Sequence, residues 1–273
     1  MPTQTVDIAI VMVTYNGIHP ECLSTLRIAM QHTRHSTALI VVDNASSDFD
    51  AYAYVKNQIP EAHVVLRNHN SGFGRASNRG ASEVHARSYF FLNPDTKLMD
   101  VRVLDTLSDV LQAHPQVGIA APRVRYMDGS HQQTARRFPE WYMPFVQRTR
   151  FANTQQGQRY RDQFLLQGVD PDKRRLVDWV QGSAFLIDGA LFREIGGFDD
   201  RYFMYFEDVD LCRACWDKGR AVYYVPEAEV HHVYGQGSAK EKTVAKNLFQ
   251  NKLARVHVDS WVKYLLKWGT RRL

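Results

Sequence analysis

The chain reads Ile8-Ala9-Ile10-Val11-Met12-Val13-Thr14 close to its N-terminus and continues with Tyr15-Asn16-Gly17. A continuous apolar run of this length is typical of a strand that is buried on both faces. Strands of that kind occur in parallel sheets, where crossover helices cover both sides. The polar, glycine-containing segment that follows predicts a turn at the carboxyl end of the strand.

The N-terminal half repeats this alternation of short apolar runs with helical patterns. Strands are expected at 39–42, 63–66, 89–92 and 117–120, and helices at 20–32, 49–58, 73–86 and 100–113. Strand, helix and strand at this spacing are the signature of a parallel sheet with crossover helices. The sequence therefore predicts an α/β fold with a mostly parallel central sheet.

Polar side chains follow each of the first four apolar runs. These clusters occupy positions 15–17, 43–48, 68–74 and 93–95. In open α/β sheets, ligands bind at the carboxyl ends of the strands. One such cluster is an ordinary turn, but four at the same edge predict a binding site.

Beyond position 120 the alternation changes. Residues 121–180 are rich in arginine and lysine with few strand signals, which indicates a functional or a disordered loop. Strand-like composition returns at 177–187, 221–225 and 228–232, and 239–268 has a helical pattern. We therefore expect one α/β domain at 1–238, in which the basic region 121–180 separates the halves 1–120 and 181–238. A basic amphipathic helix is expected in 239–273.

Three carboxylates stand within four positions in Glu207-Asp208-Val209-Asp210, at the start of a helical pattern that ends at Gly219. In the first turn of a helix, backbone N–H groups and the helix dipole favour the ionised form of a carboxylate. An ionised carboxylate beside apolar side chains is suited to general-base chemistry. Acidic residues also favour helix N-termini for structural reasons alone, so the pattern by itself leaves both interpretations open.

The composition of the chain indicates where the protein is located and whether its cysteines form disulfides. The 273 residues carry a net charge of +5, without an apolar run long enough to cross a bilayer and without a basic-then-apolar segment at the N-terminus. A cytoplasmic protein is therefore expected. The three cysteines, Cys22, Cys212 and Cys215, do not make a disulfide framework. Cys212 and Cys215 have half of the spacing of a zinc site, but their helical pattern favours packing in the core.

Asp43 directly follows a central strand, where its carboxylate can accept the N3–H of a uracil or thymine ring. Adenine and cytosine have no such donor, so this contact would select uridine or thymidine nucleotides. The same residue could instead form an Asx turn with Ser46. The turn Asn70-Ser71-Gly72-Phe73-Gly74 leads into a helix and can bring backbone N–H groups near a ligand.

Asp95 ends the segment Asn93-Pro94-Asp95, where a carboxylate can bind a hard divalent cation that also holds a diphosphate. The pair His231-His232 ends a late strand and could add a ligand, although such pairs are more often structural. Together these segments supply an acceptor for a nucleotide base, a diphosphate–metal site and a base at a helix start. That set suits the transfer of a sugar from a nucleotide diphosphate.

The ordered motifs are similar to those of glycosyltransferase family 2, in its bacterial rhamnosyltransferase-like branch, over about residues 7–268. The resemblance implies a GT-A fold, with a single nucleotide-sugar-binding Rossmann-like domain, and an inverting transfer from a nucleotide-sugar. The residues that carry it are Thr14-Tyr15-Asn16, 42–48, the spaced set Asn70, Gly72, Phe73, Gly74, Ala76, Asn78 and Gly80, the run 92–96, Gly182-Ser183-Ala184, Gly196-Gly197-Phe198-Asp199, Phe203 and Tyr205 with 207–212, and His232 with Ser238.

The motif match also implies roles for single residues. Asp208 is implied to be the catalytic base, with Glu207 beside it, and Asp43 to bind the nucleotide base. Asp95 is implied to bind Mg²⁺ or Mn²⁺, with His232 as the expected second ligand. Further residues expected at the nucleotide are Thr14, Tyr15, Asn16, Asn70, Gly72, Phe73, Asn78 and Asn93.

One position departs from the wider family, much of which carries Asp-x-Asp where this chain has Asn93-Pro94-Asp95. The metal site thereby has one negative charge fewer. The branch that this chain resembles often carries the Asn form, so the resemblance still implies activity.

For the substrates, the resemblance implies dTDP-L-rhamnose as the donor and a saccharide or a polyprenyl-linked saccharide as the acceptor, in the synthesis of a cell-surface polysaccharide. Two alternatives are the same fold with a UDP-hexose or UDP-galactofuranose, and a non-catalytic nucleotide-sugar-binding subunit. A dinucleotide oxidoreductase is disfavoured because its glycine fingerprint is missing. No nucleic-acid partner is expected.

The C-terminal segment interleaves basic residues with leucine, tryptophan and tyrosine at helical spacing. Such a helix can lie on an anionic membrane, which would make the protein peripheral on the inner face of the cytoplasmic membrane. Alternatively, its apolar stripe packs on the domain and its lysines are solvated.

Overall fold

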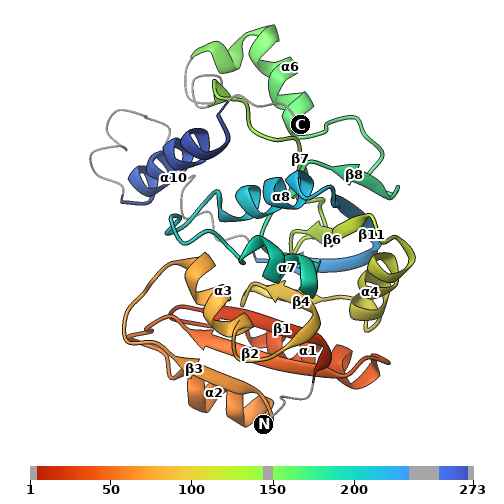
Figure 1. Cartoon of the computed structure of the whole chain (residues 1–273), viewed down its shortest axis with the longest axis vertical. Coiled ribbons are helices and arrows are strands. Elements are labelled where there is room, and N and C mark those ends of the chain that lie inside the picture. The colour runs from red at the N-terminus through yellow and green to blue at the C-terminus, as the bar shows by residue number, and fades with distance from the viewer. Residues whose placement is uncertain (1–4, 144–149, 234–251, 270–273) are drawn as a thin grey trace.

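A nine-stranded sheet forms the centre of the molecule, with strand order β3-β2-β1-β4-β10-β6-β11-β5 and β8 paired to β11 (Figure 1). The computed structural model describes residues 5–143, 150–233 and 252–269. Ser238 and the positions 239–251 and 270–273 of the C-terminal segment therefore lie outside the described residues.

The first half of the sheet is parallel, as the sequence predicts. Its strands pair in the order β3-β2-β1-β4, and each connection between them contains a helix. The elements are β1 (Val6–Thr14), α1 (Pro20–His32), β2 (Thr37–Asp43), α2 (Ala51–Gln58), β3 (His63–Leu66), α3 (Phe73–Ala81) and β4 (Ala86–Leu92).

The second half of the sheet is mixed. Strand β10 runs antiparallel to β4 and β6, whereas β11 runs parallel to β6. The elements are β5 (Thr96–Leu98), α4 (Val103–Ala113), β6 (Val117–Arg125), β8 (Arg175–Val177), β10 (Ala184–Asp188), α7 (Gly189–Ile195), α8 (Glu207–Asp217) and β11 (Ala221–His232).

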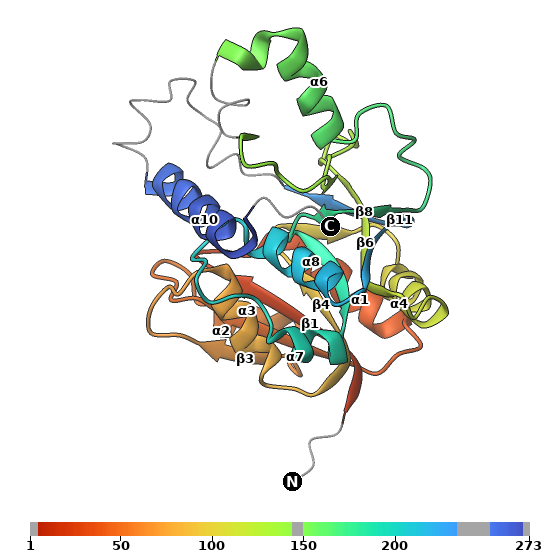
Figure 2. The same cartoon turned by 45° about the horizontal axis from the view of Figure 1, so that its top comes forward.

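Three further parts lie outside this sheet. A small two-stranded sheet pairs β7 (Ala135–Arg136) with β9 (Trp179–Val180). The η1 turn (Arg150–Asn153) and α6 (Gln155–Phe164) lie at the opposite end of the molecule from α2 and β3 (Figure 1). Helix α10 (Lys252–Trp268) follows the part of the chain that is not described and lies beside α8 in both views (Figures 1 and 2).

Two apolar clusters pack on the two faces of the sheet, and the alternation of β1 divides them. Ile8, Ile10 and Met12 face a cluster that includes residues of α1, α2 and α4. Ala9 and Val11 face a second cluster, to which α3, α7, α8 and α10 contribute. Because β1 is apolar on both faces, it lies in the middle of the core, as its composition predicts.

Some elements differ from the expectations. The two strands expected at 221–225 and 228–232 are one strand, β11, whose register shifts between Val225 and Glu229. Pro226 lies in the shifted stretch and cannot donate to a ladder, which accounts for the break in the sequence pattern. The helix expected at 73–86 ends at Ala81, and the region 121–180, expected to be a loop, contains short strands and α6.

Candidate functional site

The polar clusters that follow the strands do meet at one edge of the sheet. Thr14 at the end of β1 is the register partner of Asp43 at the end of β2. Ala184 opposes Leu92, which places Gly182 and Ser183 beside the end of β4. His232 opposes Thr96, which places the end of β11 beside Asp95. This edge therefore assembles residues that are far apart in the sequence.

Asp43 and Asn16 organise the loops after β1 and β2. The backbone N–H of Asn16 donates to Ser46 Oγ at 2.7 Å, and Asn16 Oδ1 accepts from the N–H of Ser47 at 2.8 Å. The Asp43 carboxylate accepts from both the N–H and the hydroxyl of Ser46. The Asx turn that the sequence left open is thus present. It uses mainly Oδ1 of Asp43, since the Oδ2 contact with Ser46 is longer, at 3.4 Å.

The turn before α3 is held by asparagine side chains. Asn44 Nδ2 donates to Asn70 Oδ1 at 2.9 Å, and Asn70 Oδ1 also accepts from the Gly72 N–H at 3.0 Å. Gly72 has a φ of +87°, and a Cβ there would lie 1.9 Å from the Phe203 carbonyl oxygen. Only glycine fits this position, because both its conformation and its contact exclude a side chain.

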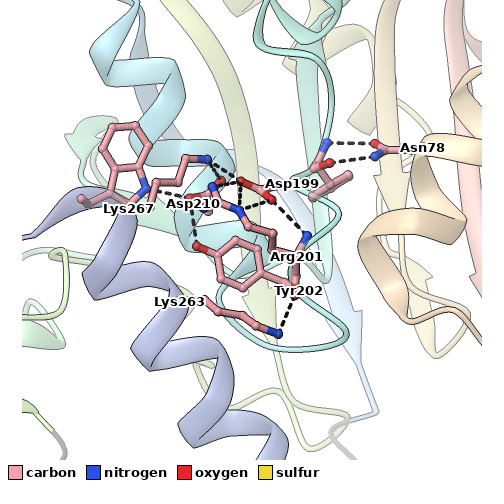
Figure 3. A network of polar contacts seen from close by, with 9 residues as sticks. Asn78, Asp199, Arg201, Tyr202, Asp210, Lys263 and Lys267 are labelled. Carbon is pink, nitrogen blue, oxygen red and sulfur yellow. Dashed lines mark hydrogen bonds and ion pairs between the residues drawn. The ribbon is translucent and has the colours of Figure 1, made fainter.

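Helix α3 carries two more of the expected nucleotide residues, Phe73 and Asn78. A Cβ at Gly182 would lie 3.6 Å from Phe73 Cε1, so the Phe73 ring borders the site. Asn78 has a different contact set: its Nδ2 donates to the Phe198 carbonyl at 2.7 Å and its Oδ1 accepts from the Phe198 N–H at 2.8 Å (Figure 3). The amide of Asn78 therefore fixes the loop before α8.

Asp208 is placed at the first turn of α8, next to β10. The N–H of Gly182 donates to Asp208 Oδ2 at 2.9 Å, and the N–H of Val209 donates to Oδ1 at 2.8 Å. Glu207 is buried, and its Oε2 has no hydrogen-bond partner among the described residues. The two adjacent carboxyls thus differ in how well the backbone supports a negative charge.

The protonation of this pair differs from the sequence expectation. Burial raises the pKa of both carboxyls, and for Glu207 burial together with the charge of Asp208 raises the pKa to about 8. The cost of desolvating a buried charge therefore outweighs the favourable effect of the helix N-terminus on the ionised carboxylates, which the sequence led us to expect. Since two N–H groups and the charge of Arg136 lower the pKa of Asp208, Asp208 ionises first and Glu207 keeps its proton at neutral pH.

Asp95 and His232 lie together at the ends of β4 and β11. His232 Nε2 is 3.1 Å from Asp95 Oδ1, and His232 Nδ1 is 3.2 Å from Gln132 Oε1. The imidazole is buried, whereas the Asp95 side chain is 37% exposed at the edge of the sheet. No third Asp, Glu, His or Cys joins the pair within the residues that the structure describes. The N–H of Asn93 donates to the Ser183 carbonyl oxygen at 2.9 Å, and Asn93 is half-buried.

Arg136 is a member of the site that the motifs do not single out. Its guanidinium lies 5.2 Å from the centre of the Trp179 ring, and its Nε donates to the Gln133 carbonyl at 2.9 Å. Its charge lowers the pKa of Asp208. In the sequence, Arg136 is one of many basic residues of the region 121–180, so composition alone cannot distinguish it.

The two cysteines of α8 pack in the core, as the sequence predicts. Cys212 and Cys215 are both buried in the core cluster. Burial raises the pKa of Cys215 to about 12, so the thiol stays protonated.

Helix α10 packs its apolar stripe on the domain. Tyr264 is buried, and Trp261, Leu265 and Trp268 pack against the same core cluster, whereas Leu266 remains 81% exposed. Two of its lysines form ion pairs, unlike in the alternative with solvated lysines: Lys263 with Asp259, and Lys267 with Asp199 and Asp210. Figure 3 shows the contacts of Lys267. Within residues 5–143, 150–233 and 252–269, no helix is both long and apolar enough to span a membrane.

The sequence of this chain is similar to those of known glycosyltransferases. The sequence model of the family described as "Glycosyltransferase like family 2" matches residues 7–256. The chain is 31% identical to an N-acetylglucosaminyl-diphospho-decaprenol L-rhamnosyltransferase of Mycobacterium tuberculosis, over 82% of this chain and 75% of that protein. It is 22% identical to the dTDP-rhamnosyl transferase RfbF of Shigella flexneri, over 86% of this chain and 71% of that protein.

Two solved structures share the fold. GalNAc-T7 with UDP, GalNAc and Mn²⁺ superposes with a TM-score of 0.64 at 17% identity, over 84% of this chain and 43% of that one. The 1–349 fragment of S. aureus TarS with UDP superposes with a TM-score of 0.55 at 12% identity, over 85% of this chain and 61% of that one. At these identities, the likeness concerns the fold.

Proposed function

The chain belongs to glycosyltransferase family 2 and has the α/β GT-A fold of a glycosyltransferase, and from that premise we propose that it is an inverting rhamnosyltransferase. The proposed donor is dTDP-L-rhamnose, and the proposed acceptor is a saccharide or a polyprenyl-linked saccharide in the synthesis of a surface polysaccharide. The names of the relatives in M. tuberculosis and S. flexneri support this choice of sugar and of donor.

The observation that carries the proposal is that three groups meet at one edge of the sheet. Asp43 and the loop of Asn16 lie at the end where β1 and β2 stop. Asp95 and His232 lie at the ends of β4 and β11. Asp208 lies beside Gly182 at the start of β10. A nucleotide-sugar presents a base, a diphosphate and an anomeric carbon, so each of the three groups has one part of the donor to act on.

In the proposed reaction, Asp208 acts as the general base. Its carboxylate takes the proton of an acceptor hydroxyl, and the hydroxyl oxygen forms a bond to the anomeric carbon on the face opposite the diphosphate. The bond between the anomeric carbon and the diphosphate oxygen breaks, and the nucleoside diphosphate leaves with its electron pair. Gly182 N–H holds the carboxylate in place, and the neutral Glu207 adds no second negative charge near the incoming acceptor.

Asp43 is proposed to read the base of the nucleotide. Oδ1 is bonded to Ser46 at short distance, while Oδ2 has only a 3.4 Å contact with Ser46 and keeps lone pairs for the N3–H of thymine or uracil. Thr14, Tyr15, Asn70, Gly72, Phe73 and Asn93 are proposed to surround the rest of the nucleotide. Asn78 is proposed to act at a distance, by holding the loop of Phe198.

Asp95 and His232 suit a divalent metal ion. One carboxylate oxygen and one imidazole nitrogen lie 3.1 Å apart at the sheet edge, where a small shift would let both bind the same ion. Mg²⁺ and Mn²⁺ accept few protein ligands when phosphate oxygens complete the shell. When bound, the metal supplies positive charge to the departing diphosphate. Gln132 orients the imidazole through Nδ1, as outer partners of metal-binding histidines do.

A polyprenyl-linked acceptor would bring the enzyme to a membrane surface, and we propose peripheral contact there. The covered stripe of α10 cannot supply this contact, because Trp261, Tyr264 and Leu265 pack on the domain. Val262 and Leu266 are the apolar side chains that α10 exposes among its described residues. Any membrane contact through this helix therefore rests on these two residues and on its basic side chains.

A screen of nucleotide-sugars for thermal stabilisation tests the choice of donor, because a ligand that binds the native state raises the melting temperature. We expect dTDP-L-rhamnose and dTDP to stabilise the protein more than ADP or CDP do. A larger shift with a UDP-hexose or UDP-galactofuranose would favour the alternative donor. Binding of a nucleotide-sugar without any sugar transfer to polyprenyl-linked saccharides would favour a non-catalytic binding subunit.

A further inference from the structure

The turn that precedes Glu207 and Asp208 contains two residues in an uncommon conformation. Tyr205 and Phe206 both have a φ of 67°, in the left-handed region that bulky side chains rarely adopt. Phe206 is also the N-cap of α8, and its side chain makes no capping hydrogen bond. Such a turn persists only where the surrounding contacts over-determine it. The groups that hold the turn therefore set the direction in which α8 begins.

Part of that support comes from α10. Ser260 is fully buried, and its hydroxyl donates to the carbonyl oxygen of Met204 at 2.8 Å. The His257 ring centre lies 5.0 Å from that of Tyr205 and 5.4 Å from that of Phe206. One helix thus contacts three consecutive residues of the turn, directly before the catalytic pair.

A second set of contacts joins α10 to the first turn of α8 itself. Asp210 accepts hydrogen bonds from Lys267 Nζ at 2.7 Å and from Trp268 Nε1 at 2.6 Å (Figure 3). Lys267 also donates to Asp199 at 2.8 Å, and so it lies between two carboxylates of the loop and of α8. Asp210 is 2% exposed, so its charge depends on these partners. Helix α10 is therefore bound to the chain on both sides of Glu207 and Asp208.

The opposite side of the loop rests on α3 and β10. The N–H of Phe73 donates to the Phe203 carbonyl oxygen at 3.1 Å, and Gly72 touches the same carbonyl. On the catalytic side, the N–H of Gly182 binds Asp208 at 2.9 Å. The loop is thus fixed between α3 on one side and α10 on the other.

We propose that α10 is a latch that positions the catalytic carboxylate, with Ser260 and Lys267 as positioning residues. The proposal rests on the proposed function of Asp208. Ser260 fixes the left-handed turn before α8, and Lys267 fixes Asp210 after the pair. Together they keep the Asp208 carboxylate at the N–H of Gly182. A misplacement of ~1 Å at a reacting centre can cost ~10²-fold in rate.

The test uses the full chain and four variants: Ser260→Ala, Lys267→Met, Lys267→Arg and Asp259→Asn. We expect Ser260→Ala and Lys267→Met to lower kcat at least ~10-fold, while KM for the donor and the affinity for dTDP change less than ~2-fold. Lys267→Arg keeps the bridge to Asp199 and Asp210, so it should retain most of kcat. Asp259→Asn, at an exposed position of the same helix, should match the wild type.

Hydrogen exchange measured by mass spectrometry separates the latch from the activity. In Ser260→Ala, we expect faster exchange over residues 203–210 and unchanged exchange over β1 and β2. If the wild type transfers no sugar but the exchange changes as stated, the proposed function fails and the latch stands. Unchanged kcat with unchanged exchange would overturn the latch. So would a parallel loss of kcat and dTDP binding, since α10 would then support the whole fold instead of the carboxylate.

Discussion

Replacement of Glu207 by glutamine tests the electrostatics of the site in isolation from catalysis. Glu207 is buried beside Asp208, and its pKa rises from 4.5 to about 8 because of burial and that neighbouring charge. At a pH between 4.5 and about 8, Glu207 holds a proton in the folded protein but has lost it in the unfolded chain. The free energy of unfolding of the wild type therefore decreases as the pH rises through this window, and it levels off above the folded-state pKa.

The size of the effect follows from the shift. Each pKa unit corresponds to ~1.4 kcal/mol, so the rise costs the wild type about 3 kcal/mol by pH 7 and ~5 kcal/mol in full, above pH 8. Glutamine has nearly the shape of the neutral carboxyl and does not titrate. We therefore expect Glu207→Gln to equal the wild type in stability near pH 4.5 and to exceed it by a few kcal/mol at pH 7.5.

Urea unfolding of both proteins at pH 5.0, 6.0, 7.0 and 7.5 measures this difference, provided that the m-values agree. Glu61→Gln is the matched control, because Glu61 is exposed and its replacement should leave the pH dependence of stability unchanged. If the difference between Glu207→Gln and wild type stays constant across this range, Glu207 is ionised at neutral pH. The assignment of separate protonation states to the pair would then be wrong.

Other predictions concern the ends of the sheet and the C-terminal helix. Asp43→Ala should reduce the thermal stabilisation by dTDP, while the rate of the chemical step in the bound complex stays within a few-fold of wild type. If ADP and dTDP stabilise the wild type equally, the Asp43 carboxylate does not read the base. Excess chelator should abolish sugar transfer, and Mg²⁺ or Mn²⁺ should restore it, with His232→Ala raising the metal concentration that half-maximal activity requires. Full activity in the presence of chelator would exclude the metal site. The full chain should sediment with anionic vesicles at low salt and be released at high salt, and Leu266→Glu should weaken that binding. If the wild-type protein stays in the supernatant at low salt, it makes no membrane contact.

Much of the fold could be predicted because its signals are local. The run from Ile8 to Thr14 is apolar on both faces, which a central parallel strand requires. The helix 20–32 is bounded by Pro20 and observed with the same limits. The family and the GT-A fold also followed from the ordered motifs, and the comparisons confirm both. Strand β10 could not be placed in the sheet order from the sequence, because its pairing between β4 and β6 depends on contacts with distant segments.

The positions of the candidate site residues follow from the sequence more readily than their electrostatics do. The polar clusters after the strands mark the edge, and the structure brings Asp95 and His232 to 3.1 Å, whereas their role as metal ligands stays a prediction. Burial of Glu207 is a property of the folded environment, so the sequence suggested an ionised pair where the structure has a raised pKa. Likewise, Lys267 reads as a solvated or membrane-facing lysine until the positions of Asp199 and Asp210 are known.

The rate of rhamnose transfer by Asp208→Asn tests the central claim most directly. The amide keeps the size of the carboxylate and can still bond to the N–H of Gly182, but it cannot accept the acceptor's proton. We predict that the variant binds dTDP as the wild type does and transfers rhamnose from dTDP-L-rhamnose ~10²–10⁴-fold more slowly, the usual range for loss of a general base. Transfer within a few-fold of the wild-type rate would contradict the assignment of Asp208 as the base.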